Sequence, residues 1–185
     1  MIRREYASSA QEEKSYAMAS TTFTRLYAAS DKHQVVKTII VAGSPTTDPN
    51  SSLLHWRIFA TTSGSKSVLF DVIPGGSDGR TGVLTVVSKQ YAYSKSATGI
   101  CVFNIVNEIT VQQLFDLMLQ KGRDRYSYDD TGSGCRYWCT VILGDLEAAA
   151  IIEVGSQNSF LQYVAAHAVI NPAAYPMPVR KGQFY

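Results

Sequence analysis

One cysteine stands where the chain could activate it as a nucleophile. Cys135 follows the glycine-rich turn TGSG and opens a run whose apolar residues recur at helical spacing. A thiol in the first turn of a helix feels the partial positive charge of unpaired N–H groups, which lowers its pKa and favours the thiolate. The same N–H groups can stabilise an oxyanion. The apolar stripe predicted on this helix consists of Cys135, Trp138, Cys139, Ile142, Leu146 and Ala149.

A predicted hairpin supplies a histidine and a carboxylate. Two β-rich segments, LLHWRIFATT and SVLFDVIPGG, are joined through a Ser-Gly-Ser turn. With Ser63 at the centre of this turn, His55 lies directly opposite Asp71, where an imidazole and a carboxylate can hydrogen-bond. The core-face pairs in the same register are Trp56 with Phe70 and Ile58 with Val68.

These three residues have the types that cysteine acyl transfer requires. Cys135 would be the thiolate, His55 the proton-transferring base, and Asp71 the group that orients the imidazole. His167, on a later predicted helix, is the alternative base. The residues expected to bind the substrate are Trp56, Arg57, Tyr126, Tyr128 and Arg136. For the tyrosines, packing within the fold is the alternative interpretation.

The motifs HWRI and GCRYW carry a resemblance to known families. A histidine on a strand that precedes a cysteine heading a helix resembles the circularly permuted papain-like arrangement of lecithin:retinol acyltransferase-like enzymes. The resemblance covers roughly residues 50 to 150 and implies the same roles for His55, Asp71 and Cys135. The chain departs from that pattern in having Gly before the cysteine instead of Asn, and Asp as the third group instead of His. LLHWRIF with GSGCRYW is also similar to an uncharacterised family of small fungal proteins, which implies no activity.

The sequence offers no motif for a bound metal or cofactor. Cys135 and Cys139 are four residues apart, but no second Cys/His pair stands near them to complete a zinc site. The glycine-rich segments lack the lysine of a phosphate-binding loop and the spacing of a dinucleotide fingerprint. Seventeen basic against 15 acidic residues give a net charge of +2, too small to indicate a nucleic-acid surface. We therefore expect no metal, no cofactor and no nucleic-acid partner.

Strand signals fill the first half of the chain and helix signals the second. Strands are expected at 34–43, on both sides of the Ser-Gly-Ser turn, in TGVLTVVSKQYAY and in GICVFNIVNEI. One helix is expected between Thr110 as N-cap and Gly122 as C-cap, a second from Cys135, and a third with Ser156 as its N-cap. This order predicts an α+β fold, an antiparallel sheet with helices packed on one face. Residues 1–32 are expected to form a flexible arm, and residues 33–185 a single domain.

Composition and charge limit the compartment and the partners. The odd count of three cysteines and the absence of an apolar leader favour a reducing, cytoplasmic compartment, and no apolar run is long enough to span a membrane. Expected partners are a small-molecule substrate and, as an alternative, a second copy of the chain. The leading hypothesis is a cysteine-dependent enzyme that transfers or hydrolyses an acyl group. The alternatives are a cofactor-free isomerase or cyclase of fungal secondary metabolism, and a non-catalytic binding domain.

Overall fold

The structure is a computed structural model that describes residues 21–75 and 78–185. Its elements in chain order are β1 (Thr22–Leu26), η1 (Ala29–Asp31), β2 (Thr38–Pro45), β3 (Leu54–Thr61), β4 (Ser67–Gly75), β5 (Thr81–Lys89), β6 (Gly99–Asn104), α1 (Val111–Gln120), β7 (Tyr126–Ser127), α2 (Cys135–Ala148), α3 (Ser156–Ile170) and β8 (Gln183–Phe184).

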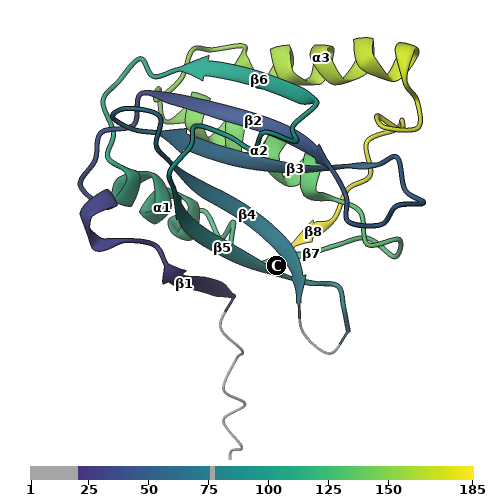
Figure 1. Cartoon of the computed structure of the whole chain (residues 1–185), viewed down its shortest axis with the longest axis horizontal. Helices are drawn as coiled ribbons and strands as arrows, with labels where there is room; N and C mark the ends of the chain where they lie inside the picture. Colours follow the sequence, from purple (N-terminus) through teal and green to yellow (C-terminus); the bar gives the residue numbers. More distant parts are fainter. Residues whose placement is uncertain (1–20, 76–77) are drawn as a thin grey trace, which may run out of the picture.

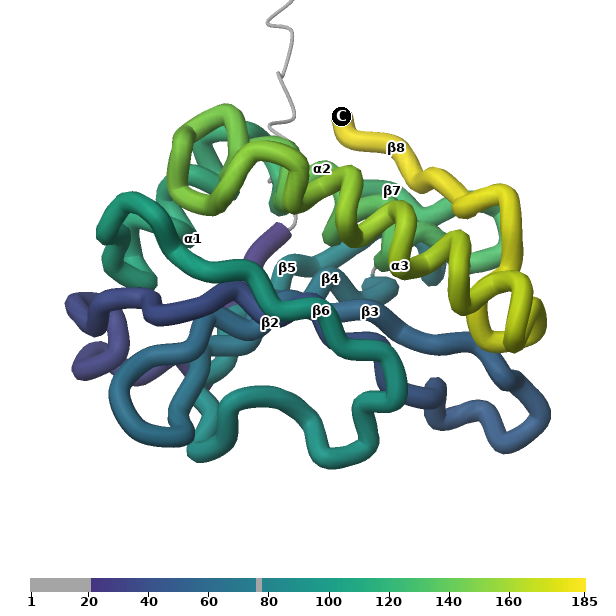
Figure 2. Tube along the Cα trace, turned by 90° about the horizontal axis from the view of Figure 1, so that it is seen from above, coloured from purple at the N-terminus to yellow at the C-terminus, as the bar shows by residue number. Residues whose placement is uncertain are grey.

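The strands form one sheet, and the helices cover one face of it. The strand order is β6-β2-β3-β4-β5-β7-β8; every neighbour along this path is antiparallel, and β1 adds to β5 in parallel (Figure 1). Figure 2 shows α1, α2 and α3 together on one side of the sheet, with the connecting loops of the strands on the other. The α+β fold with a one-sided helical layer is therefore confirmed.

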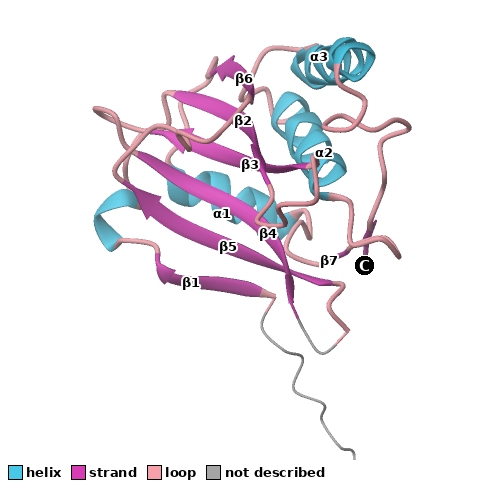
Figure 3. Ribbon diagram, turned by 45° about the vertical axis from the view of Figure 1, so that its right-hand side comes forward, coloured by secondary structure: helices cyan, strands magenta, loops and turns pink. Residues whose placement is uncertain are grey.

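The main core lies between the sheet and the helices. Alternate residues of β3 and β4, among them Trp56, Ile58 and Phe70, are almost fully buried against the apolar faces of the helices. A smaller cluster around Phe59 and Leu69 covers the opposite face of the sheet. α2 lies between the sheet and α3 (Figure 3), so its buried residues contact neighbours on both sides. This enclosure fixes the position of the first turn of α2.

The hairpin of β3 and β4 has a different register from the predicted one. Ile58 pairs with Phe70 and Ala60 with Val68, a shift of two residues from the predicted pairs of Trp56 with Phe70 and Ile58 with Val68. The turn is centred on Gly64, whose φ of +68° suits glycine, and not on Ser63. Because side chains alternate along a strand, a shift of two residues keeps each on its predicted face.

β3 and β4 pair along only part of their length. Their ladder ends at the pair of Ile58 with Phe70, beyond which β3 stays with β2 and β4 stays with β5. In Figure 1 the two strands run side by side near their turn and separate toward the right, with α2 behind them. We call this separation the β3–β4 gap. It leaves backbone groups on both strands free to bond with something other than each other.

The ends of the helices refine the predictions made from sequence. Thr110 caps α1 through a reciprocal capping box with Gln113, and Gly122 follows the helix with a φ of +67°. Gly155 occupies the cap position of α3, so Ser156 is its first helical residue and not its cap. α2 ends at Ala148, and Ala149 is exposed instead of continuing the apolar stripe.

The N-terminal segment contributes to the sheet from residue 21 onward. Within the range 1–32, expected as an arm, β1 pairs with β5 and η1 follows it; residues 1–20 lie outside the described residues. Among the helices that the structure describes, none is both long and apolar enough to cross a membrane.

Candidate active site

The β3–β4 gap brings a cysteine, a histidine and an aspartate together. His55 Nε2 lies 2.6 Å from Asp71 Oδ1 across the gap. The backbone N–H of Trp56 donates to Cys135 Sγ over 3.4 Å. A strand's N–H groups lie in the plane of its sheet, so this bond places the sulfur at the edge of β3 that β4 has left. His55 and Asp71 lie beyond the last pair of the β3–β4 ladder; extended to them, the observed register would make them diagonal neighbours, whereas direct opposition was predicted.

A glycine-rich turn delivers the cysteine to this position. Asp129 Oδ1 accepts hydrogen bonds from the backbone N–H groups of Thr131 at 2.9 Å and Ser133 at 2.8 Å. These bonds hold the backbone of the turn in one conformation. Gly134 has a φ of +145°, a conformation that a residue with a side chain rarely adopts. The Gly134 carbonyl accepts a hydrogen bond from the Tyr126 hydroxyl over 2.9 Å. The chain therefore enters α2 along a fixed path.

The electrostatics of the site favour a thiolate beside an imidazolium. Burial alone would lower the pKa of His55, but its hydrogen bonds to Asp71 and Cys135 and the charges of both groups raise that pKa to about 10. Burial would raise the pKa of the Cys135 thiol, yet the hydrogen bond and charge of His55 and the Trp56 N–H lower it. Because Asp71 binds Nε2, an interaction between the imidazole and the thiol has to use Nδ1.

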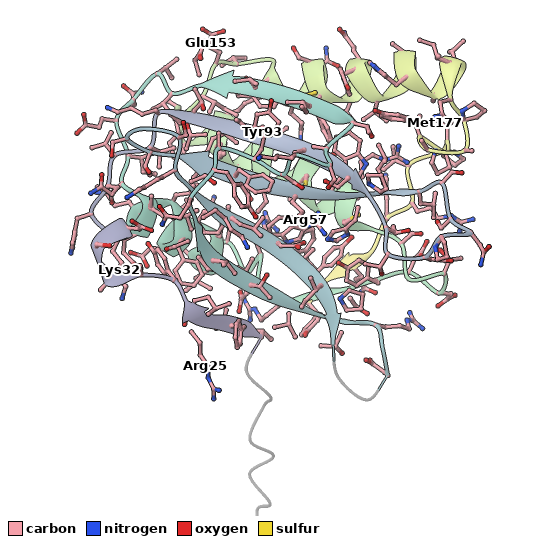
Figure 4. All side chains as sticks on the ribbon, viewed as in Figure 1. Arg25, Lys32, Arg57, Tyr93, Glu153 and Met177 are labelled. Atoms are coloured by element: carbon pink, nitrogen blue, oxygen red, sulfur yellow. The ribbon has the colours of Figure 1, made fainter. Side chains whose placement is uncertain are left out.

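Arg57 completes the charge balance. Its Nε donates to Asp71 Oδ2 over 2.8 Å, so the buried carboxylate has one cationic partner on each oxygen. Figure 4 shows Arg57 in the region where β3 and β4 separate. Arg57 therefore bonds to the carboxylate, whereas it was expected to contact a substrate.

The other two cysteines have apolar surroundings. Burial raises the pKa of Cys101 to about 12, and burial raises the pKa of Cys139 well above its usual range. Cys139 is fully buried on the inner face of α2, one turn beyond Cys135. His167 forms a hydrogen bond with the Tyr163 carbonyl through Nδ1, and its imidazole packs against the Tyr163 ring. His55, and not the alternative base His167, is therefore the histidine next to Cys135.

A cavity opens beside the sulfur. It encloses about 120 Å³, room for a small group of atoms rather than a whole drug-sized ligand. Its walls come from the start of β3, the turn before α2, Tyr128 and the C-terminal tail. The predicted site residues that line it are His55, Trp56, Tyr128, Cys135 and Arg136. Tyr126 lies behind the wall, where its hydroxyl bridges Gly134 and Gly182.

Sequence reasoning missed the residues that the tail and β2 bring to the cavity. Thr46 follows β2, and Ala174, Pro176 and Arg180 belong to the tail after α3. The tail has no periodic pattern, so no local signal predicts where it packs. The role of the Trp56 N–H could not be predicted either, because the sequence of side chains does not show which backbone groups lose their partner strand.

Comparison with known proteins identifies a family for the chain but assigns it no activity. Neither the curated proteins nor the solved structures contain a match to it. A family model described as a domain of unknown function, DUF7770, matches residues 38–185. This match covers all of the strands and helices around the site, and the chain therefore belongs to the DUF7770 family.

Proposed function

We propose that the protein is a cysteine-dependent enzyme that transfers or hydrolyses the acyl group of an amide, ester or thioester. The observation that carries the proposal is the placement of Cys135 at the start of α2 and at the edge of β3, next to His55, whose Nε2 is bound by Asp71. The raised pKa of His55 and the lowered pKa of Cys135 agree with this arrangement. A thiolate, a proton carrier and an orienting carboxylate are the groups that covalent acyl transfer needs. The resemblance of this order of residues to permuted papain-like enzymes supports the same chemistry.

The reaction divides into two displacements. The Cys135 thiolate attacks the carbonyl carbon, a C–S bond forms, and the carbonyl electrons move onto oxygen. The oxyanion collapses as the bond to the leaving group breaks, and His55 Nδ1–H protonates that group. Neutral His55 then removes a proton from water or an acceptor, which attacks the thioester, and the thiolate leaves. The imidazolium is thereby restored.

The first turn of α2 offers donors for the oxyanion. The first intrahelical bond runs from the Trp138 N–H to the Gly134 carbonyl over 2.9 Å. The N–H groups of the three residues before Trp138 therefore have no acceptor within the helix. Together with the helix dipole, they favour negative charge beside Cys135.

Limiting iodoacetamide at neutral pH tests the nucleophile. We expect mass spectrometry of the native protein to find Cys135 alkylated well ahead of Cys101 and Cys139, because only its pKa is lowered. His55→Ala should slow the labelling of Cys135, whereas His167→Ala, a matched change outside the site, should leave it unchanged. Equal, slow alkylation of all three cysteines would contradict the proposal.

A generic acyl donor tests the covalent step. After incubation with p-nitrophenyl acetate, we expect an acetyl group on Cys135 in the wild type and in Cys139→Ala, and none in Cys135→Ala. Rapid alkylation of Cys135 without any acetyl capture would argue against acyl transfer and in favour of the isomerase alternative.

A further inference from the structure

The wall of the cavity beside Cys135 contains a buried arginine that has no carboxylate partner among the described residues. Arg136 is 7% exposed. Its Nη2 donates to the Pro176 carbonyl over 2.6 Å, while its Nη1 is buried without a hydrogen-bond partner. Among the described residues, no carboxylate forms an ion pair with Arg136. An unpaired buried guanidinium is costly, and a protein keeps one where a ligand supplies the missing acceptor.

The position of Arg136 ties it to the reacting sulfur. It is the next residue after Cys135, and both residues and Pro176 line the same cavity. Burial lowers the pKa of the guanidinium, and negative charge on Cys135 would oppose that effect. A guanidinium remains protonated at all ordinary pH values, so the cavity wall carries a permanent positive charge.

The rest of the wall is suited to an anion. Thr46, another lining residue, has an Oγ1 that is also buried without a hydrogen-bond partner and can donate a hydrogen bond. Arg180, about half exposed, also lines the cavity, and its Nη1 lies 3.6 Å from Asp129 Oδ2. Among the described residues that line the cavity, none is an aspartate or glutamate.

We propose that the cavity binds a carboxylate of the substrate beside Arg136 and Thr46, the two lining residues with unpaired buried donors, so that the substrates are amides, esters or thioesters bearing a free carboxylate near the scissile carbonyl. This inference rests on the proposed function, because it assigns a substrate class to the same nucleophile. A planar carboxylate presents two acceptor oxygens, which a guanidinium N–H and a hydroxyl can share. The enclosed volume of about 120 Å³ suits such a small group and leaves the remainder of the substrate at the mouth.

Paired alkylating agents test the inference separately from the proposed function. Iodoacetate and iodoacetamide have nearly the same shape, but only iodoacetate carries a carboxylate. We measure the iodoacetate-to-iodoacetamide rate ratio at Cys135 and divide it by the ratio for glutathione. A charge-assisted hydrogen bond predicts a normalised ratio of about 10 or more, with a rate that saturates at high iodoacetate concentration.

Variants of Arg136 test whether this residue causes the preference of Cys135 for iodoacetate. Arg136→Gln should reduce the normalised ratio to near one, and Arg136→Lys should retain part of it. Arg25→Gln removes one positive charge from an exposed strand position, away from the cavity (Figure 4), and should leave the ratio unchanged. A wild-type ratio near one, alongside rapid iodoacetamide labelling, would overturn the carboxylate site while leaving the nucleophile intact. A high ratio that survives Arg136→Gln would overturn the role of Arg136.

A protection experiment with the wild type avoids any dependence on the folding of variants. Succinate should slow iodoacetamide labelling of Cys135, and the neutral succinamide should not. Equal protection by both compounds, or by neither, would overturn the inference. Slow labelling of Cys135 in the absence of any competitor would instead reject the proposed function.

Discussion

At the scale of single residues, folding shifts the pKa values of His55 and Cys135 in opposite directions. In an unfolded chain the imidazole has a pKa near 6.5 and the thiol a pKa near 9.0, so both are largely neutral between these values. In the folded protein the pKa of the imidazole is raised and the pKa of the thiol is lowered, which favours the proton on the imidazole. The two shifts therefore have opposite effects on the number of protons that the folded protein binds over this range.

This balance predicts how stability depends on pH. A raised His55 pKa stabilises the fold below pH 6.5 and loses that effect as pH rises toward about 10. The lowered Cys135 pKa acts oppositely: its contribution is present above pH 9.0 and is lost as pH falls through the folded-state pKa. In the wild type the two dependences oppose each other between pH 6.5 and 9.0. Cys135→Ser removes the second and part of the first, and the Asp71 carboxylate still raises the pKa of His55.

Urea unfolding at several pH values measures the effect. We expect the stability of the Cys135→Ser variant to fall relative to the wild type as pH rises from 6.5 to 9.0. Cys139→Ser should cost about 1–3 kcal/mol by placing a hydroxyl in the apolar core, with no such pH dependence. A difference between wild type and Cys135→Ser that is constant over this range would contradict the thiolate–imidazolium pair.

Asp71 should tune the reactivity of a cysteine that it does not contact through a hydrogen bond. Asp71→Asn keeps the shape of the side chain but removes the charge that helps to raise the pKa of His55. A less basic imidazole stabilises the thiolate less. Loss of the Asp71 charge by itself would lower the pKa of the thiol, but the hydrogen bond and charge of His55 have the larger influence on it. The midpoint of the pH profile for iodoacetamide labelling of Cys135 should therefore move to higher pH. Asp145→Asn, which breaks a carboxylate–arginine pair elsewhere, serves as the control. An unchanged midpoint in Asp71→Asn would remove the orienting role.

At the scale of secondary-structure elements, the site depends on two strands that separate. The β3–β4 gap frees the Trp56 N–H on one side and the Val72 carbonyl on the other. Cys135 accepts from the first group, and the Tyr128 hydroxyl donates to the second. Two side chains, Tyr128 and Cys135, thus replace the β3–β4 hydrogen bonds that are missing in the gap. These two buried backbone groups therefore keep hydrogen-bond partners.

Tyr128→Phe tests this replacement. Loss of the hydroxyl leaves the Val72 carbonyl buried without its donor, which should lower the free energy of unfolding by about 1–3 kcal/mol. Tyr137→Phe is the matched control: its hydroxyl makes no hydrogen bond among the described residues, so its effect should stay within about 0.5 kcal/mol. Chemical denaturation of both variants decides the matter, and equal losses would mean that the Tyr128 bond adds nothing.

At the scale of the whole molecule, the C-terminal tail closes the site. After α3 the tail runs past the cavity, where Pro176 and Arg180 line it, and ends in β8 against β7. The Gly182 N–H donates to the Tyr126 hydroxyl over 2.9 Å, and that hydroxyl in turn bonds to Gly134. One tyrosine therefore links the end of the chain to the turn before Cys135.

Gly182→Ala should detach this part of the tail. A Cβ atom at position 182 would lie 2.3 Å from the backbone oxygen of Ser127, a contact that only a backbone shift can relieve. We expect faster tryptic cleavage after Lys181 in this variant, whereas Gln183→Ala, an exposed neighbour, should be cleaved at the wild-type rate. Identical digestion of both variants would show that the tail is not held at Gly182.

The sequence by itself determined the types of element and the residues capable of chemistry. The 3.6-residue spacing after Thr110 and after Cys135 predicted α1 and α2, and strand signals predicted β2 to β6, because these patterns record which side of a local element is buried. The faces of His55 and Asp71 were also predictable, since alternation along a strand survives a shift of two residues.

Only the tertiary structure decided how those residues meet. The register of the hairpin depends on whether Ser63 or Gly64 centres the turn, and either choice buries an apolar face. The β3–β4 gap arises because each strand keeps its other neighbour, a competition between pairings that no local pattern records. The unpaired Arg136 Nη1 and the tail over the cavity likewise result from contacts between distant segments, whose energies appear only when the chain is packed.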